Sequence, residues 1–481
     1  MLPERKSYYF WICGAAFALL NAIAVAFEFY FAGLIPVALL FAWLAFNHYD
    51  KLVYFVVLAT PLSINLDQLA IEGVGLYVPT EPILIGLMLL FLLETIRRNP
   101  IDPKIFKHPI SLVIYAHLAW LAITSYLSEM PVVSYKFLTA RLWFVVVMYF
   151  ITTQIFKDYR AIRTFLWLYM ISLCVVVGYT ITIHAQNDFS AEAAHWAMTP
   201  FFNDHTSYGA LLAMYFPVVL GLLIAGNYSF NGRIVLLVIT LILAVGLILS
   251  YTRAAWLSLI AAAGVFVILY FRINFRFVLL GLGIAIMSFF VYKDVIIQNL
   301  EKNRQDSSEN LSEHVESVSN ISTDASNLER LNRWNCAWRM FLDKPVFGFG
   351  PGTYQFQYAP YQSSADRTII STNSGDGGNA HSEYLGPLAE TGLIGSLIMI
   401  ILIGVVIHTA VKLYISVDRA DKSKRTLIMT LLLGLITYYV HGVLNNYLDT
   451  DKASIPFWSF TAAFVAIELF HSPNSREKTQ A

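Results

Sequence analysis

The sequence has 481 residues, of which 57% are hydrophobic and 13% are charged, with a formal net charge of +0. Soluble globular proteins carry roughly 25% charged residues, so this composition excludes an ordinary soluble domain and indicates a polytopic membrane protein. A balanced charge gives no reason to expect nucleic acid as a partner. The cysteines Cys13, Cys174 and Cys336 lie at no spacing typical of a metal site, and we expect neither a metal nor a cofactor.

Apolar runs near the ~20 residues needed to cross a bilayer recur along the whole chain. They predict an all-α integral membrane protein with about 12–14 transmembrane helices. The candidate spans are residues 9–27, 30–46, 52–64, 78–96, 110–127, 136–156, 162–184, 206–225, 232–250, 254–272, 276–295, 386–412, 426–444 and 454–471. The segment 52–64 reaches only about 20 Å at ~1.5 Å per residue, so the sequence leaves open whether it crosses fully. We expect the first run to be a retained helix and not a signal peptide, because another apolar segment follows almost at once.

These spans divide the chain into transmembrane helices in residues 1–295, a large polar loop in residues 296–385 and C-terminal transmembrane helices in residues 386–481. The short loops on one side of the membrane carry most of the Lys and Arg residues. By the positive-inside rule, both termini are expected in the cytoplasm and the large loop in the periplasm. Within this loop, Leu331, Trp334, Trp338 and Phe341 share one stripe, which predicts an amphipathic helix on the outer face.

Unusual charged residues gather on the outer side of this topology. Arg141 lies inside the sixth span and Arg253 lies at the junction of the ninth and tenth spans. An ionisable group at membrane depth costs at least ~2.5 kcal/mol, so each is a functional candidate, although snorkelling to the headgroups is the alternative for both. Further candidates on the same side are Asp204, His205, Arg330, Arg333, His381 and Glu383. Two or three guanidinium groups around an outward-facing pocket suit a diphosphate, which they can bind without a metal.

His381 follows the glycine-rich residues 375–380 at the start of the helix that re-enters the membrane. With a pKa near 6.5, a histidine there can take a proton from a sugar hydroxyl as it attacks. Either Glu383 or Glu390 could orient the imidazole, and a solvated or capping role remains the alternative for both. We expect Gly386-Pro387 to interrupt the helix early and leave its first turns as a short broken piece.

Several segments together resemble the bacterial O-antigen ligase and polymerase superfamily. His381-Ser382, followed after nine residues by Gly392-x-x-Gly395, is similar to the family's ligase signature, and Thr252-Arg253-Ala254-Ala255-Trp256 is similar to its Ser-Arg-Gly-Ala-Trp segment. Arg330-x-x-x-Trp334 with the segment 344–352 resembles the family's outer loop, and residues 202–209 resemble its Phe-x-Asn-Pro-Asn segment. The chain departs from the family pattern at Ala254, Ser382 and Asp204-His205.

The resemblance implies a GT-C-like, metal-independent, inverting glycosyltransferase of the bacterial inner membrane with its active site facing the periplasm. It implies that Arg253 and Arg330, with Arg141 and Arg333 as further candidates, bind the diphosphate of an undecaprenyl-diphosphate-linked glycan. It implies that His381 activates the acceptor hydroxyl, with Asp204, His205 and Glu383 as candidate acceptor-side or supporting residues. The acceptor is lipid A-core for a ligase, which we favour, or a growing glycan for a polymerase. A lipid-linked sugar transporter or a scaffold without chemistry are alternatives from other classes.

Overall fold

The computed structural model describes residues 3–29, 32–33, 35–69, 75–98, 101–274, 325–364, 371 and 378–472, with isolated positions between 276 and 292. The chain divides into two compact units, Met1–Phe55 and Val56–Ala481. The first unit contains α1 (Pro3–Ala26), α2 (Ile35–Asn47) and the start of α3 (Tyr49–Ala59). Within it, the rings of Phe41 and Phe55 pack with their centroids 5.4 Å apart.

The second unit is helical, with one short antiparallel pair of strands, β1 (Ile64–Asn65) and β2 (Tyr77–Val78). Its helices are α4 (Thr80–Arg98), α5 (Pro103–Phe106), α6 (Pro109–Tyr126), α7 (Pro131–Val145), α8 (Thr152–Ile155), α9 (Tyr159–Ala185), α10 (Ala191–Ala194), α11 (His205–Ala225), α12 (Phe230–Leu249), α13 (Arg253–Tyr270), α16 (Ala325–Asp343), α17 (Tyr354–Gln357), α18 (Leu385–Ser416), α19 (Lys422–His441) and α20 (Asp451–Phe470). Short 3₁₀ turns occupy Thr60–Leu62, Leu66–Leu69 and Ala359–Tyr361, and a π-helical stretch, Val146–Ile151, joins α7 to α8.

Eight helices in the described part of the chain are long and apolar enough to cross a membrane: α6, α7 with its extension to Ile155, α9, α11, α12, α13, α18 and α20. This confirms the predicted all-α integral membrane class. The predicted spans 206–225, 232–250 and 254–272 agree with α11, α12 and α13 to within two residues. Most of the predicted span 276–295 and of the loop before α16 lies outside the described residues. The segment 52–64 is helical only as far as Ala59, after which a 3₁₀ turn follows.

Short polar side chains fix where the helices begin. Asp204 accepts a hydrogen bond from the backbone N–H of Ser207 at 2.6 Å, which caps the first turn of α11. Asp158 caps α9 in the same way, and Asp421 caps α19. The helices therefore start where a capping side chain satisfies backbone donors that have no partner within the helix.

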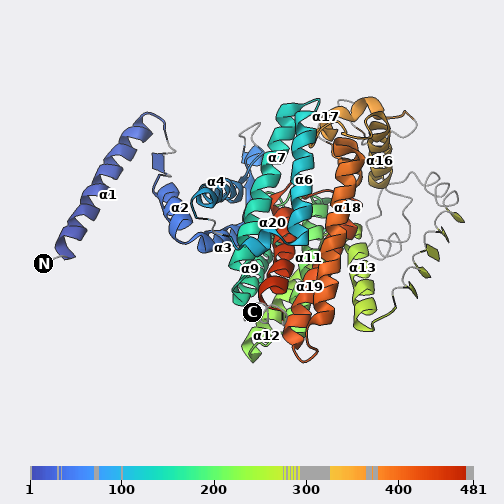
Figure 1. Cartoon of the computed structure of the whole chain (residues 1–481). Coiled ribbons are helices and arrows are strands. Elements are labelled where there is room, and N and C mark those ends of the chain that lie inside the picture. Colours follow the sequence, from blue (N-terminus) through green and yellow to red (C-terminus); the bar gives the residue numbers. More distant parts are fainter. Residues whose placement is uncertain are drawn as a thin grey trace. The chain divides into compact units, whose positions relative to one another are not determined.

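The α20 helix forms the centre of the second unit. Of the eight candidate spans it has the largest buried share, 83%, whereas α13 buries 17%. Figure 1 shows α6, α7, α18 and α20 side by side, with α16 and α17 at one end of this group. That end therefore carries the segments that hold the candidate site residues.

The α18 helix is broken at Gly392, whose φ of 68° and ψ of −171° are not helical. The break leaves carbonyl groups without helical partners, and other segments supply donors: the N–H of Phe349 bonds Ala389 O at 3.1 Å and the N–H of Gly350 bonds Glu390 O at 2.8 Å. The indole N–H of Trp120 bonds Thr391 O at 2.9 Å. The expected interruption at Gly386-Pro387 is therefore wrong. Pro387 fits in the first turn of the helix, where its missing N–H costs nothing.

Candidate functional site

The α16 helix presents two different faces. Its buried face includes Cys336, Ala337 and Met340, which pack in one core cluster with Tyr354 and Tyr358. Two residues of the predicted apolar stripe, Leu331 and Trp338, are 39% and 50% exposed and do not belong to this cluster. The helix is therefore amphipathic as predicted, but the face packed against the protein is not the stripe that the sequence indicated.

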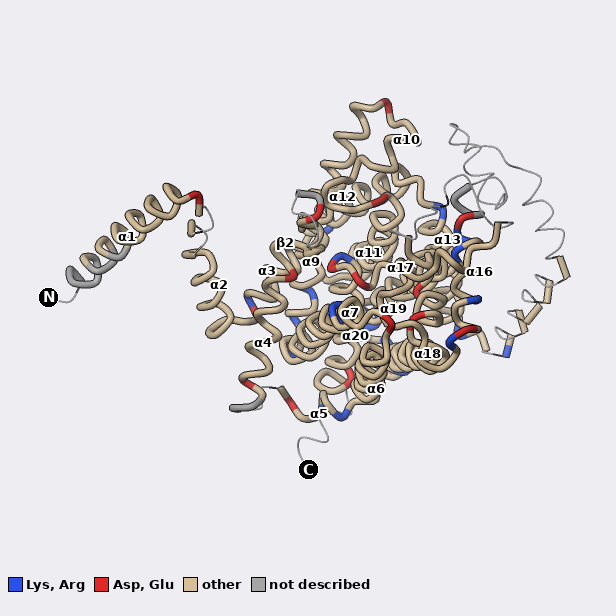
Figure 2. Tube along the Cα trace, turned by 90° about the horizontal axis from the view of Figure 1, so that it is seen from above, with Lys and Arg blue, Asp and Glu red and all other residues tan. Residues whose placement is uncertain are grey.

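A buried ion pair lies on α16. The Nε of Arg333 donates to Glu329 Oε1 at 2.7 Å, and the two side chains are 5% and 7% exposed. The guanidinium also lies over the ring of Tyr358, 4.0 Å from the centroid. Figure 2 shows basic and acidic positions adjacent along this helix. Because breaking a buried pair leaves an uncompensated charge, Glu329 is required for Arg333 to stay in place.

His381 sits on a tight turn between α16 and α18. Its φ is 48°, in the left-handed region that few non-glycine residues adopt. The backbone N–H of His381 bonds Asn379 Oδ1 at 3.0 Å, and the indole of Trp334 on α16 donates to His381 O at 3.3 Å. Strained backbone held by surrounding contacts is frequent at functional sites.

The imidazole of His381 lies within the field of the α16 charges. Burial and then the positive charges of Arg330 and Arg333 lower the pKa of His381 to about 4, against smaller opposing effects of Asp204 and Glu329. The structure therefore brings four of the predicted residues, His381, Arg330, Arg333 and Asp204, into one electrostatic group. We call these residues, with Glu329, the arginine cluster.

Glu383 fastens the His381 turn to the segment between α19 and α20. Its Oε1 accepts hydrogen bonds from the hydroxyl of Tyr438 at 2.7 Å and from the backbone N–H groups of Tyr447 and Leu448 at 2.7 and 2.8 Å. The N–H of Glu383 donates to Gly442 O at 2.7 Å. Among the described residues, neither Glu383 nor Glu390 hydrogen-bonds the imidazole of His381. The hypothesis that one of them orients the ring finds no support in these contacts, and Glu383 positions the turn as a whole.

Arg253 and His205 lie at neighbouring helix starts. Arg253 is the first residue of α13, and the hydroxyl of the preceding Thr252 donates to His205 O at 2.8 Å. The ring of His205 meets that of His195 edge to face, with centroids 4.2 Å apart. The hydrogen bond from Thr252 to His205 joins the starts of α11 and α13, so Arg253 and His205 lie at the same end of the second unit.

A cavity of about 1130 Å³ opens beside the His381 turn. Arg141, Glu383, Glu390 and Asp449 line it, as do Asn379 and Ala380 immediately before His381. Arg141 is 8% exposed and its Nη1 donates to Leu448 O at 3.1 Å, so it does not snorkel to a headgroup. The carboxylates of Glu383, Asp449 and Glu390 all act electrostatically on its guanidinium. Arg141 therefore belongs to this cavity and not to the arginine cluster.

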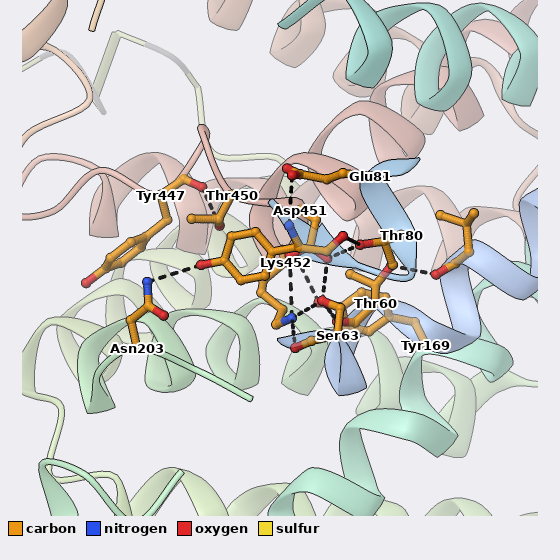
Figure 3. Close-up of polar contacts among 12 residues, drawn as sticks. Thr60, Ser63, Thr80, Glu81, Tyr169, Asn203, Tyr447, Thr450, Asp451 and Lys452 are labelled. Carbon is orange, nitrogen blue, oxygen red and sulfur yellow. Dashed lines mark hydrogen bonds and ion pairs between the residues drawn. The ribbon is translucent and has the colours of Figure 1, made fainter. Parts of the chain in front are cut away.

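A buried polar cluster at the start of α20 lies beside Glu81, which lines the cavity (Figure 3). Asp451 Oδ2 accepts hydrogen bonds from Ser63 Oγ at 2.5 Å and from Thr80 Oγ1 at 2.6 Å, and Asp451 lies 3.5 Å from Lys452 Nζ. Thr80 precedes Glu81, whose Oε2 accepts from the N–H of Tyr77 at 2.9 Å and which also lines the cavity. The start of α20 therefore holds the β1–β2 segment and Glu81 in place.

Residues 236–400 match the family model described as O-antigen ligase. This part of the chain is therefore similar to the O-antigen ligase family. The match supports the predicted superfamily and a glycosyltransferase-type membrane enzyme in general. No curated protein matches the chain.

The matched range contains Arg253, Arg330, Arg333 and His381, whereas Arg141, Asp204 and Asp449 lie outside it. The carboxylates that line the cavity with Arg141 were not predicted as a group. They come from α4, the His381 turn, α18 and the segment before α20, and α4 and α20 are far from the others in the sequence. Only Glu81, at the N-terminus of an apolar span, and Glu390, inside one, gave a local signal, because charges are rare at such positions.

Proposed function

We propose that the protein moves a glycan from undecaprenyl diphosphate to an acceptor hydroxyl on the outer face of the bacterial inner membrane. The observation that carries the proposal is the position of His381: a strained turn places its imidazole in the field of Arg330 and Arg333, inside the range that matches the O-antigen ligase family. We favour lipid A-core as the acceptor, which makes the protein a ligase. A polymerase that uses the same donor and the same site, with a growing glycan as acceptor, is the second candidate that the family match supports.

In the proposed reaction, the acceptor oxygen attacks the anomeric carbon and the bond from that carbon to the diphosphate oxygen breaks with inversion. His381 accepts the hydroxyl proton as the new bond forms. Arg330, with Arg253 at the start of α13, stabilises the charge that develops on the departing undecaprenyl diphosphate. Arg333 supports this field from its buried pair with Glu329. No step requires a metal.

The lowered pKa of His381 suits the two stages of the proposed reaction, donor binding and then proton transfer from the acceptor. With a pKa of about 4 in the empty site, the imidazole is neutral and able to accept a proton at physiological pH. A bound diphosphate adds negative charge beside Arg330 and Arg333, and therefore raises the pKa of His381 towards that of an effective base. Donor binding would in this way prepare the histidine for the acceptor.

The test is product formation in liposomes that contain the purified protein and an undecaprenyl-diphosphate-linked glycan, alone and then with lipid A-core. We expect transfer to lipid A-core for a ligase, and longer carrier-linked chains from the donor alone for a polymerase. The variant His381→Ala should lose about 10²–10⁴-fold in rate. The matched control is His408→Ala, at an exposed position on α18. Movement of the lipid-linked glycan across the bilayer with no new bond would favour a transporter and contradict the proposal.

A further inference from the structure

The cavity beside the His381 turn carries charge opposite to that of the arginine cluster. Four carboxylates, those of Glu81, Glu383, Glu390 and Asp449, line it against two cations, Lys136 and Arg141. Asp449 borders the cavity and is exposed there, and no other residue of the described chain hydrogen-bonds its carboxylate, which lies in the field of Arg141. The cavity therefore presents a carboxylate that is available to a ligand.

Two further polar groups of the cavity wall lack partners. The indole N–H of Trp143, whose side chain is 9% exposed, and the amide oxygen of Asn446 have no hydrogen-bond partner in the described structure. Buried polar groups are nearly always satisfied, so both point to a ligand that supplies an acceptor and a donor. A sugar hydroxyl does both, whereas a diphosphate offers acceptors only.

Electrostatics also disfavour a diphosphate in this cavity, because four carboxyl groups line it against two cations. Its phosphate oxygens would lie among four carboxylates, and like charges at short range are strongly unfavourable. Burial raises the pKa of Glu383, which favours hydrogen bonding by its carboxyl group over ionisation. Trp143, Tyr354 and Phe356 add aromatic surface to the same wall. Aromatic faces and carboxyl groups together suit the apolar faces and the hydroxyls of a sugar ring.

We propose that this cavity binds the acceptor as a hydroxyl-rich glycan without acidic groups near the reacting sugar, held by Asp449, Asn446 and Trp143. The inference rests on the proposed function, because it assigns the second substrate of the same site. Asn379, Ala380 and Glu383 line the cavity on either side of His381 in sequence, and the arginine charges act on the imidazole itself.

The experiment measures binding by saturation-transfer NMR to the full-length protein in detergent micelles. The probes are a neutral tetrasaccharide, maltotetraose, an acidic one, a hyaluronan tetrasaccharide, and inorganic diphosphate. We expect maltotetraose to bind more tightly than the acidic probe, and inorganic diphosphate not to displace it. Asp449→Asn should weaken maltotetraose binding at least threefold and Asp449→Lys at least tenfold. The control Asp188→Asn, in the exposed loop after α9, should change it less than twofold.

Tighter binding of the hyaluronan tetrasaccharide, displacement by diphosphate, or no glycan binding at all would each overturn the inference. Diphosphate binding to Arg330 tests the proposed function separately, since Asp449→Asn should leave it unchanged. In the liposome assay, Asp449→Asn should raise the KM for the acceptor and leave that for the donor within twofold. Comparing lipid A-core with carrier-linked glycan then shows which source of the acceptor sugar uses the cavity. An unchanged acceptor KM for both sources contradicts the inference even if transfer itself is confirmed.

Discussion

The two sides of the His381 turn differ in how their charge is held. In the arginine cluster, the guanidinium of Arg333 is locked by an ion pair with Glu329 within one helix. In the cavity, Asp449 is exposed and its carboxylate has no such lock. A fixed positive field is suited to a leaving group of constant chemistry, and an open acidic group such as Asp449 is suited to a substrate that is released as product. The comparison teaches that the residues next to a single turn can contribute to two surfaces of opposite charge.

The largest effect is expected from breaking the locked side. Glu329→Gln removes the counter-charge of a buried arginine and should lower the free energy of unfolding by about 3–5 kcal/mol. The matched control is Glu129→Gln, because Glu129 pairs with Lys344 where both side chains are 37% or more exposed. Exposed pairs contribute about 0–1 kcal/mol. Thermal or SDS unfolding of both variants measures the difference, and equal losses would show that burial of the Arg333 pair has no energetic role.

A smaller effect is expected from removing the charge that faces the donor. Arg330→Ala should weaken binding of undecaprenyl diphosphate by roughly 10–100-fold, because a charge-assisted contact to phosphate contributes about 1.5–3 kcal/mol. The KM for the acceptor should stay within twofold. Binding titrations with undecaprenyl diphosphate measure the effect on the donor, and initial rates in liposomes measure the KM for the acceptor. Arg330→Lys is the informative companion, since it keeps the charge and loses the bidentate geometry. A change confined to the acceptor KM would reverse the assignment of the two sides.

The smallest expected effect is a shift in pH dependence. Because the pKa of His381 is lowered to about 4, its imidazole stays neutral as the pH falls from 8 to about 5. The value of kcat/KM, which reports the free enzyme, should therefore stay level over that range and fall only near pH 4. In Arg330→Ala, one cause of the lowering is gone, so the fall should begin at a higher pH. A fall centred near pH 6.5 in the wild type would show that the cluster does not act on His381.

The sequence predicted the helices well, because a helix that crosses a lipid bilayer needs a continuous apolar run. Such a run can be recognised from neighbouring residues in the sequence. The break in α18 was placed at Gly386-Pro387 and lies at Gly392, because its hydrogen-bond partners come from Phe349 and Gly350, about 40 residues earlier. Motif spacing indicated His381 and the arginines. The cavity could not be predicted, since Glu81, Glu390 and Asp449 meet only through packing, and nothing local marks Asp449 as a residue without a partner.

The break at Gly392 also constrains which residues of this region can vary among related proteins. The donors that satisfy the free carbonyl groups of Ala389 and Glu390 are main-chain N–H groups. These hydrogen bonds across the break therefore do not depend on the side chains of the donor residues. Gly350 and Gly392 have positive φ, and a Cβ on either would collide with neighbouring atoms. Val346 and Phe347, which precede Gly350 in the chain, are more than 40% exposed. Among related proteins, we expect Gly350 and Gly392 to be conserved and the exposed side chains of Val346 and Phe347 to vary.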